Sequence, residues 1–289
     1  MSWRTVVISH TAKLDYQIGY LVVRGQETIK IHLSEIGILV VESTAVSMTA
    51  YLLSELVKKK IKVIFCDEKR NPSSELIPYY GSHDTSVKIR RQMEWSREEK
   101  ATLWTEIVSE KIRKQAELLE QYGKTEAELL YQYINEIELG DVTNREGHAA
   151  KVYFNSLFGK GFSRDDMNSV NAALNYGYGI LLSNFNKEIV ADGYLTQLGI
   201  KHINEYNPFN LTCDLMEPFR VLVDEIVYNN IEKTFDKDFK LLLVDVLNRK
   251  VMYCGREYYL TNAIQIYLDK IFDAIEHESF DTSILYEFA

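Results

Sequence analysis

Glu146 lies in a segment of unusual composition for a helix surface. The run from Thr143 to Ala150 contains Gly147 and two alanines, which leave one helix face almost without side chains. Another backbone or a ligand can therefore come close to the carboxylate of Glu146. The structural alternative is that Glu146 is the distant member of a capping box that begins with Thr143.

A second segment carries one histidine and two acids. His202 follows Gly199 by three residues, and Asp214 and Glu217 are also three apart, so a helix presents both carboxylates on one side. Pro218 must lie in the first turn of that helix or kink it, because proline has no backbone N–H. The alternative is structural here too, since acids near a helix start suit the helix dipole and a single histidine can simply pack.

Taken together, these side chains have the chemistry of a divalent-ion site. Carboxylate oxygens combined with one imidazole suit Mg²⁺ or Mn²⁺. Such an ion polarises a phosphoryl oxygen and neutralises charge in the transition state of phosphoryl transfer. Because spacing does not show that the segments meet in space, the ion site is a hypothesis at this point.

The chain lacks the signatures of several other enzyme classes. It has no Gly-rich phosphate loop, dinucleotide fingerprint, Gly-x-Ser-x-Gly elbow or His-Glu-x-x-His sequence. These absences argue against nucleotide hydrolysis, hydride transfer and serine hydrolysis. The three cysteines have no metal-binding spacing, and no apolar run reaches about 18 residues. We therefore expect a cytoplasmic protein without a membrane span.

The net charge of −9 argues against a protein that coats DNA by bulk positive charge. The acidic excess lies in the middle and C-terminal parts, so local basic tracks remain possible DNA contacts. Four basic residues flank the segments around Glu146 and His202, namely Arg145, Lys160, Arg164 and Arg220. Solvated helix ends are the alternative explanation for them.

Strand-rich sequence gives way to helix-rich sequence along the chain. Short runs rich in β-branched residues predict strands at 5–8, 20–23, 28–33, 38–41 and 62–66, with one helix at 47–60. Closely spaced prolines predict a linker at 71–84. Apolar spacing then predicts helices at 85–122, 125–140, 143–159, 168–188, 214–230, 237–248 and 260–276, and a hairpin at 251–259.

The two segments, in this order behind a strand-rich N-terminal part, resemble the CRISPR adaptation integrase family, whose members insert new spacers. The resemblance covers essentially the whole chain. Within the family, the sequence is similar to the branch found in type II-A systems. Its most specific parts are Asn144-x-Glu146-Gly147-x-Ala149-Ala150-x-x-Tyr153-Phe154, Leu174-Asn175-Tyr176-Gly177-Tyr178, Gly199-x-x-His202 and Asp214-Leu215-x-Glu217-Pro218-Phe219-Arg220.

This resemblance implies an α+β fold. An N-terminal β-sheet domain (1–70), β-sandwich-like with one short helix, is joined by a short linker (71–84) to a mainly α-helical C-terminal catalytic domain (85–289). The implied catalytic residues and ligands of Mg²⁺ or Mn²⁺ are Glu146, His202 and Glu217. Three residues are expected beside these ligands: Asp214, Asn144 and Tyr153. Four are expected to hold DNA phosphates: Arg145, Lys160, Arg164 and Arg220.

The implied reaction is strand transfer. The 3′-hydroxyl of a short DNA fragment attacks a phosphodiester at the leader–repeat junction, and the second strand attacks at the far end of the repeat. Phosphoryl transfer needs positioning and charge stabilisation more than a covalent nucleophile, which agrees with the absence of a Ser/His or Cys/His arrangement.

The resemblance also implies partners. The family acts as a homodimer, and a dimer of a small second adaptation protein bridges two such dimers. In type II-A systems the effector nuclease and a ring-forming DNA-binding protein also take part.

Two other functions stay open. One is a metal-dependent DNA endonuclease acting on branched or single-stranded DNA, which would use the same ion site. The other is a non-catalytic DNA-binding scaffold.

Overall fold

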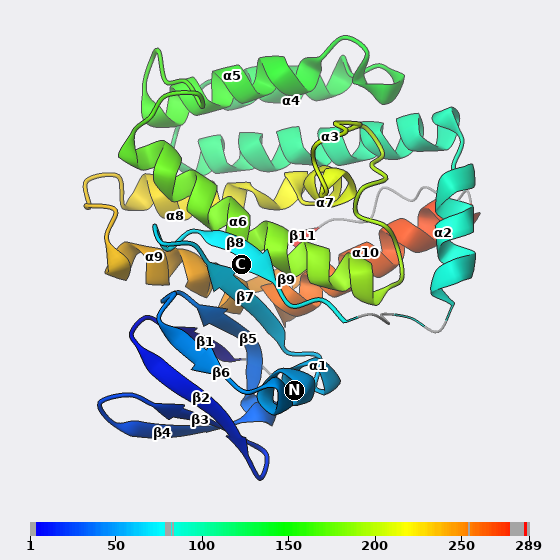
Figure 1. The fold of residues 1–289 in the computed structure, drawn as a ribbon. Helices are drawn as coiled ribbons and strands as arrows, with labels where there is room; N and C mark the ends of the chain where they lie inside the picture. The colour runs from blue at the N-terminus through cyan, green and yellow to red at the C-terminus, as the bar shows by residue number, and fades with distance from the viewer. Residues whose placement is uncertain (1–3, 79–81, 83, 254, 278–285, 288–289) are drawn as a thin grey trace.

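The computed structural model describes residues 4–78, 82, 84–253, 255–277 and 286–287. Within these residues, the N-terminal part contains two four-stranded sheets (Figure 1). The first has, in spatial order, β1 (Arg4–Ile8), β5 (Ile36–Val41), β7 (Lys62–Cys66) and the antiparallel edge strand β8 (Pro72–Glu75). The second has β4 (Thr28–His32), β3 (Tyr20–Arg24), β2 (Ala12–Gln17) and β6 (Val46–Met48).

Strand β5 is apolar on both faces because both faces are covered. Leu39 and Val41 belong to a core that the two sheets share with helix α1 (Ala50–Lys58). Ile38 and Val40 belong instead to the core of the helical part. Since successive side chains of a strand point to opposite faces, one short run serves both cores. The predicted sandwich-like domain with one short helix is therefore confirmed.

The C-terminal part is mainly helical, as predicted. Its α-helices are α2 (Thr85–Glu94), α3 (Arg97–Gln121), α4 (Ala127–Asn135), α5 (Arg145–Phe158), α6 (Ser169–Ala191), α7 (Asn210–Leu215), α8 (Val221–Asn229), α9 (Lys237–Val244) and α10 (Leu260–His277). Short 3₁₀ turns are η1 (Leu33–Glu35) in the N-terminal part and η2 (Leu139–Asp141), η3 (Glu217–Phe219) and η4 (Asp245–Asn248) here. A small sheet has the order β10 (Arg256–Tyr259), β9 (Lys250–Tyr253), β11 (Tyr286–Glu287). In the described part of the chain, no helix combines the length and apolarity needed to cross a bilayer.

Two predicted helices are divided. The helix expected at 85–122 breaks before α3, because Ser96 and Glu99 form a capping box that starts a new helix. The helix expected at 214–230 begins earlier, at Asn210, and is interrupted by η3. Pro218 causes this interruption, since it cannot donate an N–H to the preceding turn. Asp214 therefore lies near the end of one helix, and Glu217 lies in the turn after it.

Part of the predicted linker is a strand. Residues 72–75 form β8, which pairs with β7 at the edge of the first sheet. Pro72 is accepted there because the first residue of an edge strand need not donate a ladder hydrogen bond. The irregular chain begins after Glu75, and residues 79–81 and 83 lie outside the described residues. The domain boundaries at 70 and 85 stay predictions.

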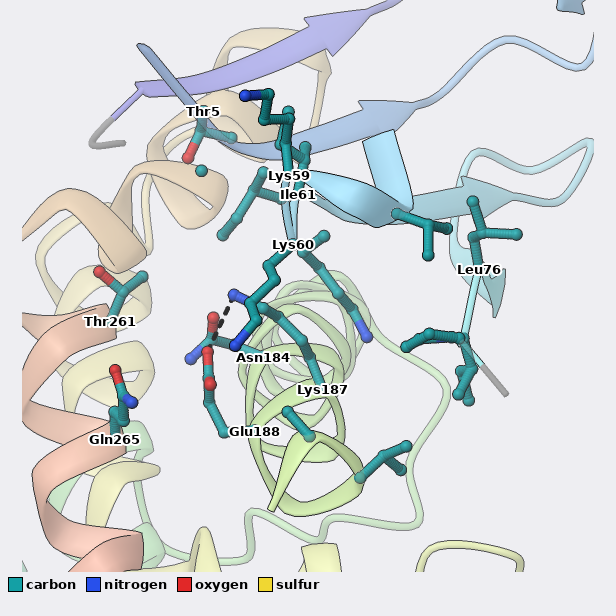
Figure 2. Close-up of a pocket in the computed structure, with 18 of the residues that line it drawn as sticks. Thr5, Lys59, Lys60, Ile61, Leu76, Asn184, Lys187, Glu188, Thr261 and Gln265 are labelled. Carbon is teal, nitrogen blue, oxygen red and sulfur yellow. Dashed lines mark ion pairs between the residues drawn. The ribbon is translucent and has the colours of Figure 1, made fainter. Parts of the chain in front are cut away.

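Glu75 joins this sheet edge to the helical part. Its carboxylate pairs with the buried Lys62 and accepts hydrogen bonds from Asn186 and, at 2.9 Å, from Ser183 of α6. A cavity of about 610 Å³ lies next to this contact, between the first sheet, α6 and α10 (Figure 2). Lys60 points into it from the end of α1. The basic residues Lys58, Lys59, Lys60 and Lys62 all line this cavity between the two parts of the protein.

Two glycines in α6 provide a test of this packing. A Cβ on Gly177 would lie 2.4 Å from Cγ1 of Val223, whereas a Cβ on Gly179 would lie no closer than 3.6 Å to Pro72. We expect Gly177→Ala to cost about 1–3 kcal/mol of stability through overpacking. Gly179→Ala should be neutral or stabilise by up to about 1 kcal/mol, because alanine favours the helix. Denaturant midpoints measure the difference, and equal stability of the two variants would contradict this packing.

Candidate metal centre

Glu146 lies in the first turn of α5. The residues that cap this helix are not Thr143 and Glu146, which the sequence suggested. Asn144, at a positive φ of 54°, caps the helix by accepting a hydrogen bond from the N–H of Gly147 at 3.3 Å. Asp141 accepts from the N–H groups of Arg145 and Glu146 at 2.7 and 3.1 Å. The alternative that Glu146 belongs to a capping box with Thr143 is therefore wrong. The Glu146 carboxylate is left for another partner.

That partner is Lys111 of α3. Its Nζ lies 2.6 Å from Oε1 of Glu146 and 2.7 Å from Oε2 of Glu217, so both carboxylates converge on one ammonium group. Helix α3 lies between α5 and α7 in Figure 1, which brings the two distant segments together. Burial works to lower the pKa of Lys111, but Glu217 and Glu146 raise it overall, so this lysine is charged at neutral pH.

Glu217 is buried and held by two cations. Its Oε1 lies 3.0 Å from Nη2 of Arg220, in addition to the ion pair between Oε2 and Lys111. Burial works to raise the pKa of Glu217, but Arg220 and Lys111 outweigh it and lower the value to about 2. The carboxylate is therefore a permanent anion at the centre of the site.

His202 is oriented by Asp214, which is completely buried. One oxygen of Asp214 accepts from the N–H groups of Ile200 and Lys201 at 2.6 and 3.0 Å, and the other lies 2.5 Å from Nδ1 of His202. This hydrogen bond is the main cause that raises the pKa of His202, against the effect of burial. The geometry assigns the proton to Nδ1 in the neutral ring, which leaves Nε2 as the donor to a metal ion.

Gly199 starts this turn because nothing larger fits. A Cβ there would come within 2.3 Å of the carbonyl oxygen of His202 and 2.9 Å of the Asp214 carboxylate. The spacing Gly199-x-x-His202 thus has a direct structural cause.

The three predicted ligands are brought to one region, but not as a finished metal cluster. Both Glu146 and Glu217 raise the pKa of His202 through their charges, which places all three within electrostatic range. Among the described residues, no three His, Cys, Asp or Glu side chains are already arranged around a metal position. The donor set nevertheless fits Mg²⁺ or Mn²⁺, since two carboxylates already share one cation and carboxylate oxygens with one imidazole are ligands that these ions accept.

Lys111 is the site residue that sequence reasoning missed. Its position continues the buried, mostly apolar stripe of Trp104, Val108 and Leu118 along α3, where a lysine is unexpected. A buried lysine on a core-facing stripe needs a carboxylate partner, and this was the available signal.

The predicted DNA-contacting residues have different surroundings. Arg145 pairs with Glu136 at 3.0 Å, and Arg220 pairs with Glu217 as described above. Arg164 donates to Asn175 at 2.6 Å and lies beside the core of the helical part. Lys160 is exposed in the turn that follows α5. Of the four, Lys160 is the side chain most open to solvent.

Tyr153, expected beside the ligands, contacts a further buried acid. Its hydroxyl donates to Asp224 at 2.9 Å, and the hydroxyl of Tyr178 donates to the same carboxylate at 2.5 Å. Burial is the main cause that raises the pKa of Asp224 to about 6. The Tyr178 ring lies 4.7 Å from the Arg220 guanidinium. Tyr178 therefore packs against Arg220, and Arg220 forms the ion pair with Glu217.

Known proteins resemble the chain in sequence and in fold. A "CRISPR-associated endonuclease Cas1" from Neisseria meningitidis serogroup C is 36% identical over 235 residues, covering 81% of this chain and 77% of that protein. A "Casposase bound to integration product" gives a TM-score of 0.77 at 18% identity, covering 98% of this chain and 93% of that one. A "Cas6-RT-Cas1--Cas2 complex" gives 0.73 at 17% identity, and this chain spans 35% of that chain.

At identities this low, the two structures show a shared fold. The sequence relationship shows the family, and the names of the sequence relatives describe endonucleases. Residues 5–246 match the family described as "CRISPR associated protein Cas1", a range that includes Glu146, His202 and Glu217; the chain belongs to the Cas1 family.

Proposed function

We propose that this chain is a metal-dependent DNA integrase that inserts spacer DNA into a CRISPR array. The observation that carries the proposal is the convergence of Glu146 and Glu217 on one cation, with His202 within electrostatic range of both carboxylates. Among the residues that the structure describes, the site offers anionic oxygens and an imidazole rather than an activated serine or cysteine. This donor set suits phosphoryl transfer, in which a hydroxyl from the substrate is the nucleophile.

The proposed ligands of Mg²⁺ or Mn²⁺ are Glu146, His202 and Glu217. A bound ion would stabilise the negative charge that develops on the attacked phosphodiester. Asp214 keeps Nδ1 of His202 engaged, so that Nε2 is the ring nitrogen left for an ion. Arg220 keeps Glu217 ionised and in place. Each of these groups acts on the position or charge of a ligand, and none needs to form a covalent intermediate.

An open groove of about 910 Å³ has His202 in its lining, and we infer that the DNA end approaches the site along it. Ile203 and Tyr206, both almost fully exposed, lie along it with Lys100. Exposed aromatic rings stack on unpaired bases, and lysine contacts the phosphate backbone. We infer that the 3′ end of the fragment occupies this groove and that Arg145, Lys160 and Arg164 contact phosphates further along the DNA.

The proposal includes partners and targets. The fragment joins at the leader–repeat and repeat–spacer junctions, by attack of its two 3′-hydroxyl groups. The chain acts as a homodimer, and a dimer of a small second adaptation protein bridges two such dimers, as the sequence resemblance implies. We take that second protein to be Cas2, because the name of one related complex includes it. The type II-A branch, with its effector nuclease and ring-forming protein, rests on the sequence resemblance.

Removal of the ion gives the direct test of this function. Purified chain and Cas2 are mixed with a labelled short duplex and a plasmid that carries a leader–repeat unit. With Mg²⁺ or Mn²⁺ we expect label to be joined covalently at the two junctions; with a chelator we expect no joined product.

Two results would replace the proposal. Cleavage of branched or single-stranded DNA without any joined product would favour a metal-dependent endonuclease. DNA binding with neither cleavage nor joining, and equal with ion and chelator, would favour a non-catalytic scaffold.

A further inference from the structure

Lys111 occupies the position where the charges of Glu146 and Glu217 meet. Its ammonium group lies 2.6 Å from one carboxylate and 2.7 Å from the other. The three residues come from three separate elements, α3, α5 and η3, so this contact is a feature of the tertiary structure. Lys111 is itself buried, which leaves its charge without a second route to water.

This arrangement has a clear electrostatic cause. Two neighbouring carboxylates in a site of low polarity repel each other and lose hydration, unless a cation compensates them. Lys111 supplies one positive charge to both, and Arg220 supplies a second to Glu217 alone. The protein therefore carries its own counter-ion at the carboxylates that it offers to a metal.

We propose that Lys111 competes with the divalent ion for Glu146 and Glu217 and thereby weakens ion binding to the free protein. This inference rests on the proposed function, because it takes these carboxylates as the ion's ligands. A dication and an ammonium group that share two carboxylates repel each other. Binding of the ion must therefore displace Lys111 from at least one of its two ion pairs. Lys111 is a positioning residue, since it acts through the ligands.

Substitution by methionine separates the charge of Lys111 from its bulk. Lys111→Met fills a similar volume but leaves both carboxylates without their shared cation. We expect this variant to bind Mn²⁺ about tenfold or more tightly than the wild type, in the absence of DNA. Binding is measured by titrating Mn²⁺ into the full chain and following free Mn²⁺ by electron paramagnetic resonance.

Lys114→Met is the matched control. Lys114 is a buried lysine one turn further along α3, and it pairs with Glu117 at 2.8 Å and with Glu110. Its replacement also removes a buried positive charge, but not from Glu146 or Glu217. We expect Lys114→Met to bind Mn²⁺ with wild-type affinity.

Two further variants locate the binding and protect the test against misfolding. The tight binding of Lys111→Met must disappear in the double variant Lys111→Met/Glu146→Gln. If Lys111→Met does not fold, Lys111→Gln removes the charge while its amide still donates a hydrogen bond to a carboxylate. In each folded variant, a fixed concentration of Mn²⁺ should raise the melting temperature more when the ion binds more tightly, because the stabilisation grows with the logarithm of the ion concentration divided by Kd.

Two results would overturn the proposal in distinguishable ways. If Lys111→Met binds Mn²⁺ no more tightly than the wild type, while Glu146→Gln abolishes binding, the ion site stands and competition by Lys111 is wrong. If Glu146→Gln leaves Mn²⁺ binding unchanged in every background, the ion is not held here, and the proposed ion site fails with it.

Discussion

Glu217→Gln is expected to lower the rate of strand transfer by about 10²-fold or more. Glutamine keeps the shape of the side chain but removes the negative charge that two cations surround. Loss of one group that organises transition-state charge typically costs about 10²–10³ in rate. The rate of covalent joining in the reconstituted assay measures this effect.

The substitution should also destabilise the fold. Lys111 would keep only Glu146 as an ion-pair partner, and Arg220 would lose its carboxylate. Breaking a buried ion pair on one side typically costs about 3–5 kcal/mol. The assay must therefore be run well below the melting temperature of the variant, and thermal unfolding reports that temperature.

Glu225→Gln separates the two effects. Glu225 is a buried glutamate of α8 that pairs with Arg249 and accepts a hydrogen bond from Gln121, whereas Glu217 pairs with Lys111 and Arg220. We expect this control to lose stability but to join DNA at nearly the wild-type rate. Joining by Glu217→Gln within about threefold of the wild-type rate, far below the loss expected for a charge-stabilising group, would show that Glu217 is not a ligand.

Residue types and spacing predicted most of the strands, because β-branched runs such as Val63–Ile64 favour the pleated, buried surface of a sheet. Strand β2 was missed since its residues, Ala12–Gln17, mix apolar and charged side chains and are covered on only part of one face. Strand β8 was missed for a different reason. Pro72 is typical of a strand breaker, and only the sheet shows that it lies in an edge strand, where proline is accepted.

Helix boundaries depended on local capping that apolar spacing does not resolve. The periodicity from 85 to 122 continues across Trp95 and Ser96, although the Ser96–Glu99 capping box starts a new helix there. The turn at Pro218 was foreseen as either a first turn or a kink. The structure decides for a break, because α7 already begins at Asn210 and Pro218 falls in the 3₁₀ turn that follows.

The ligand set followed from motifs, but its geometry did not. Thr143 was the expected cap of α5, whereas Asn144 takes that position in a left-handed conformation that sequence spacing does not reveal. Lys111 lies 35 residues before Glu146 and 106 before Glu217, so only tertiary packing brings it between them. The roles of Glu146, His202 and Glu217 as ion ligands stay predictions until they are tested.

Asp214→Asn is expected to affect folding and catalysis together, although Asp214 is not one of the proposed ligands. Its carboxylate accepts hydrogen bonds from the backbone N–H groups of Ile200, Lys201 and His202 and also engages the His202 ring. An amide would turn a donor toward some of these donors and leave them unpaired. Hydrogen bonds to a charged group contribute about 1.5–3 kcal/mol each, so we expect a loss of about 3 kcal/mol.

The rate of DNA joining by the folded Asp214→Asn protein should also fall. Without Asp214 to hold Nδ1, the His202 ring loses its fixed orientation, and loss of such an orienting partner typically costs about 10–100-fold in activity. Joining is therefore measured at a temperature where the variant is fully folded. A variant that joins DNA at the wild-type rate would show that Asp214 only supports the loop and does not position His202.

Asp192→Asn provides a control in which removal of a carboxylate charge should not lower stability. Asp192 follows α6, and its pKa is raised to about 6, chiefly by burial and then by the neighbouring Asp269 and Glu188. Because its ionised form is disfavoured in the folded protein, removing the charge should leave stability at neutral pH unchanged or slightly higher. Asp214 differs from Asp192 in its contacts, since four donors converge on its carboxylate. Only Asp214→Asn should therefore lower the melting temperature and the rate of joining; an equal loss in both variants would contradict this distinction.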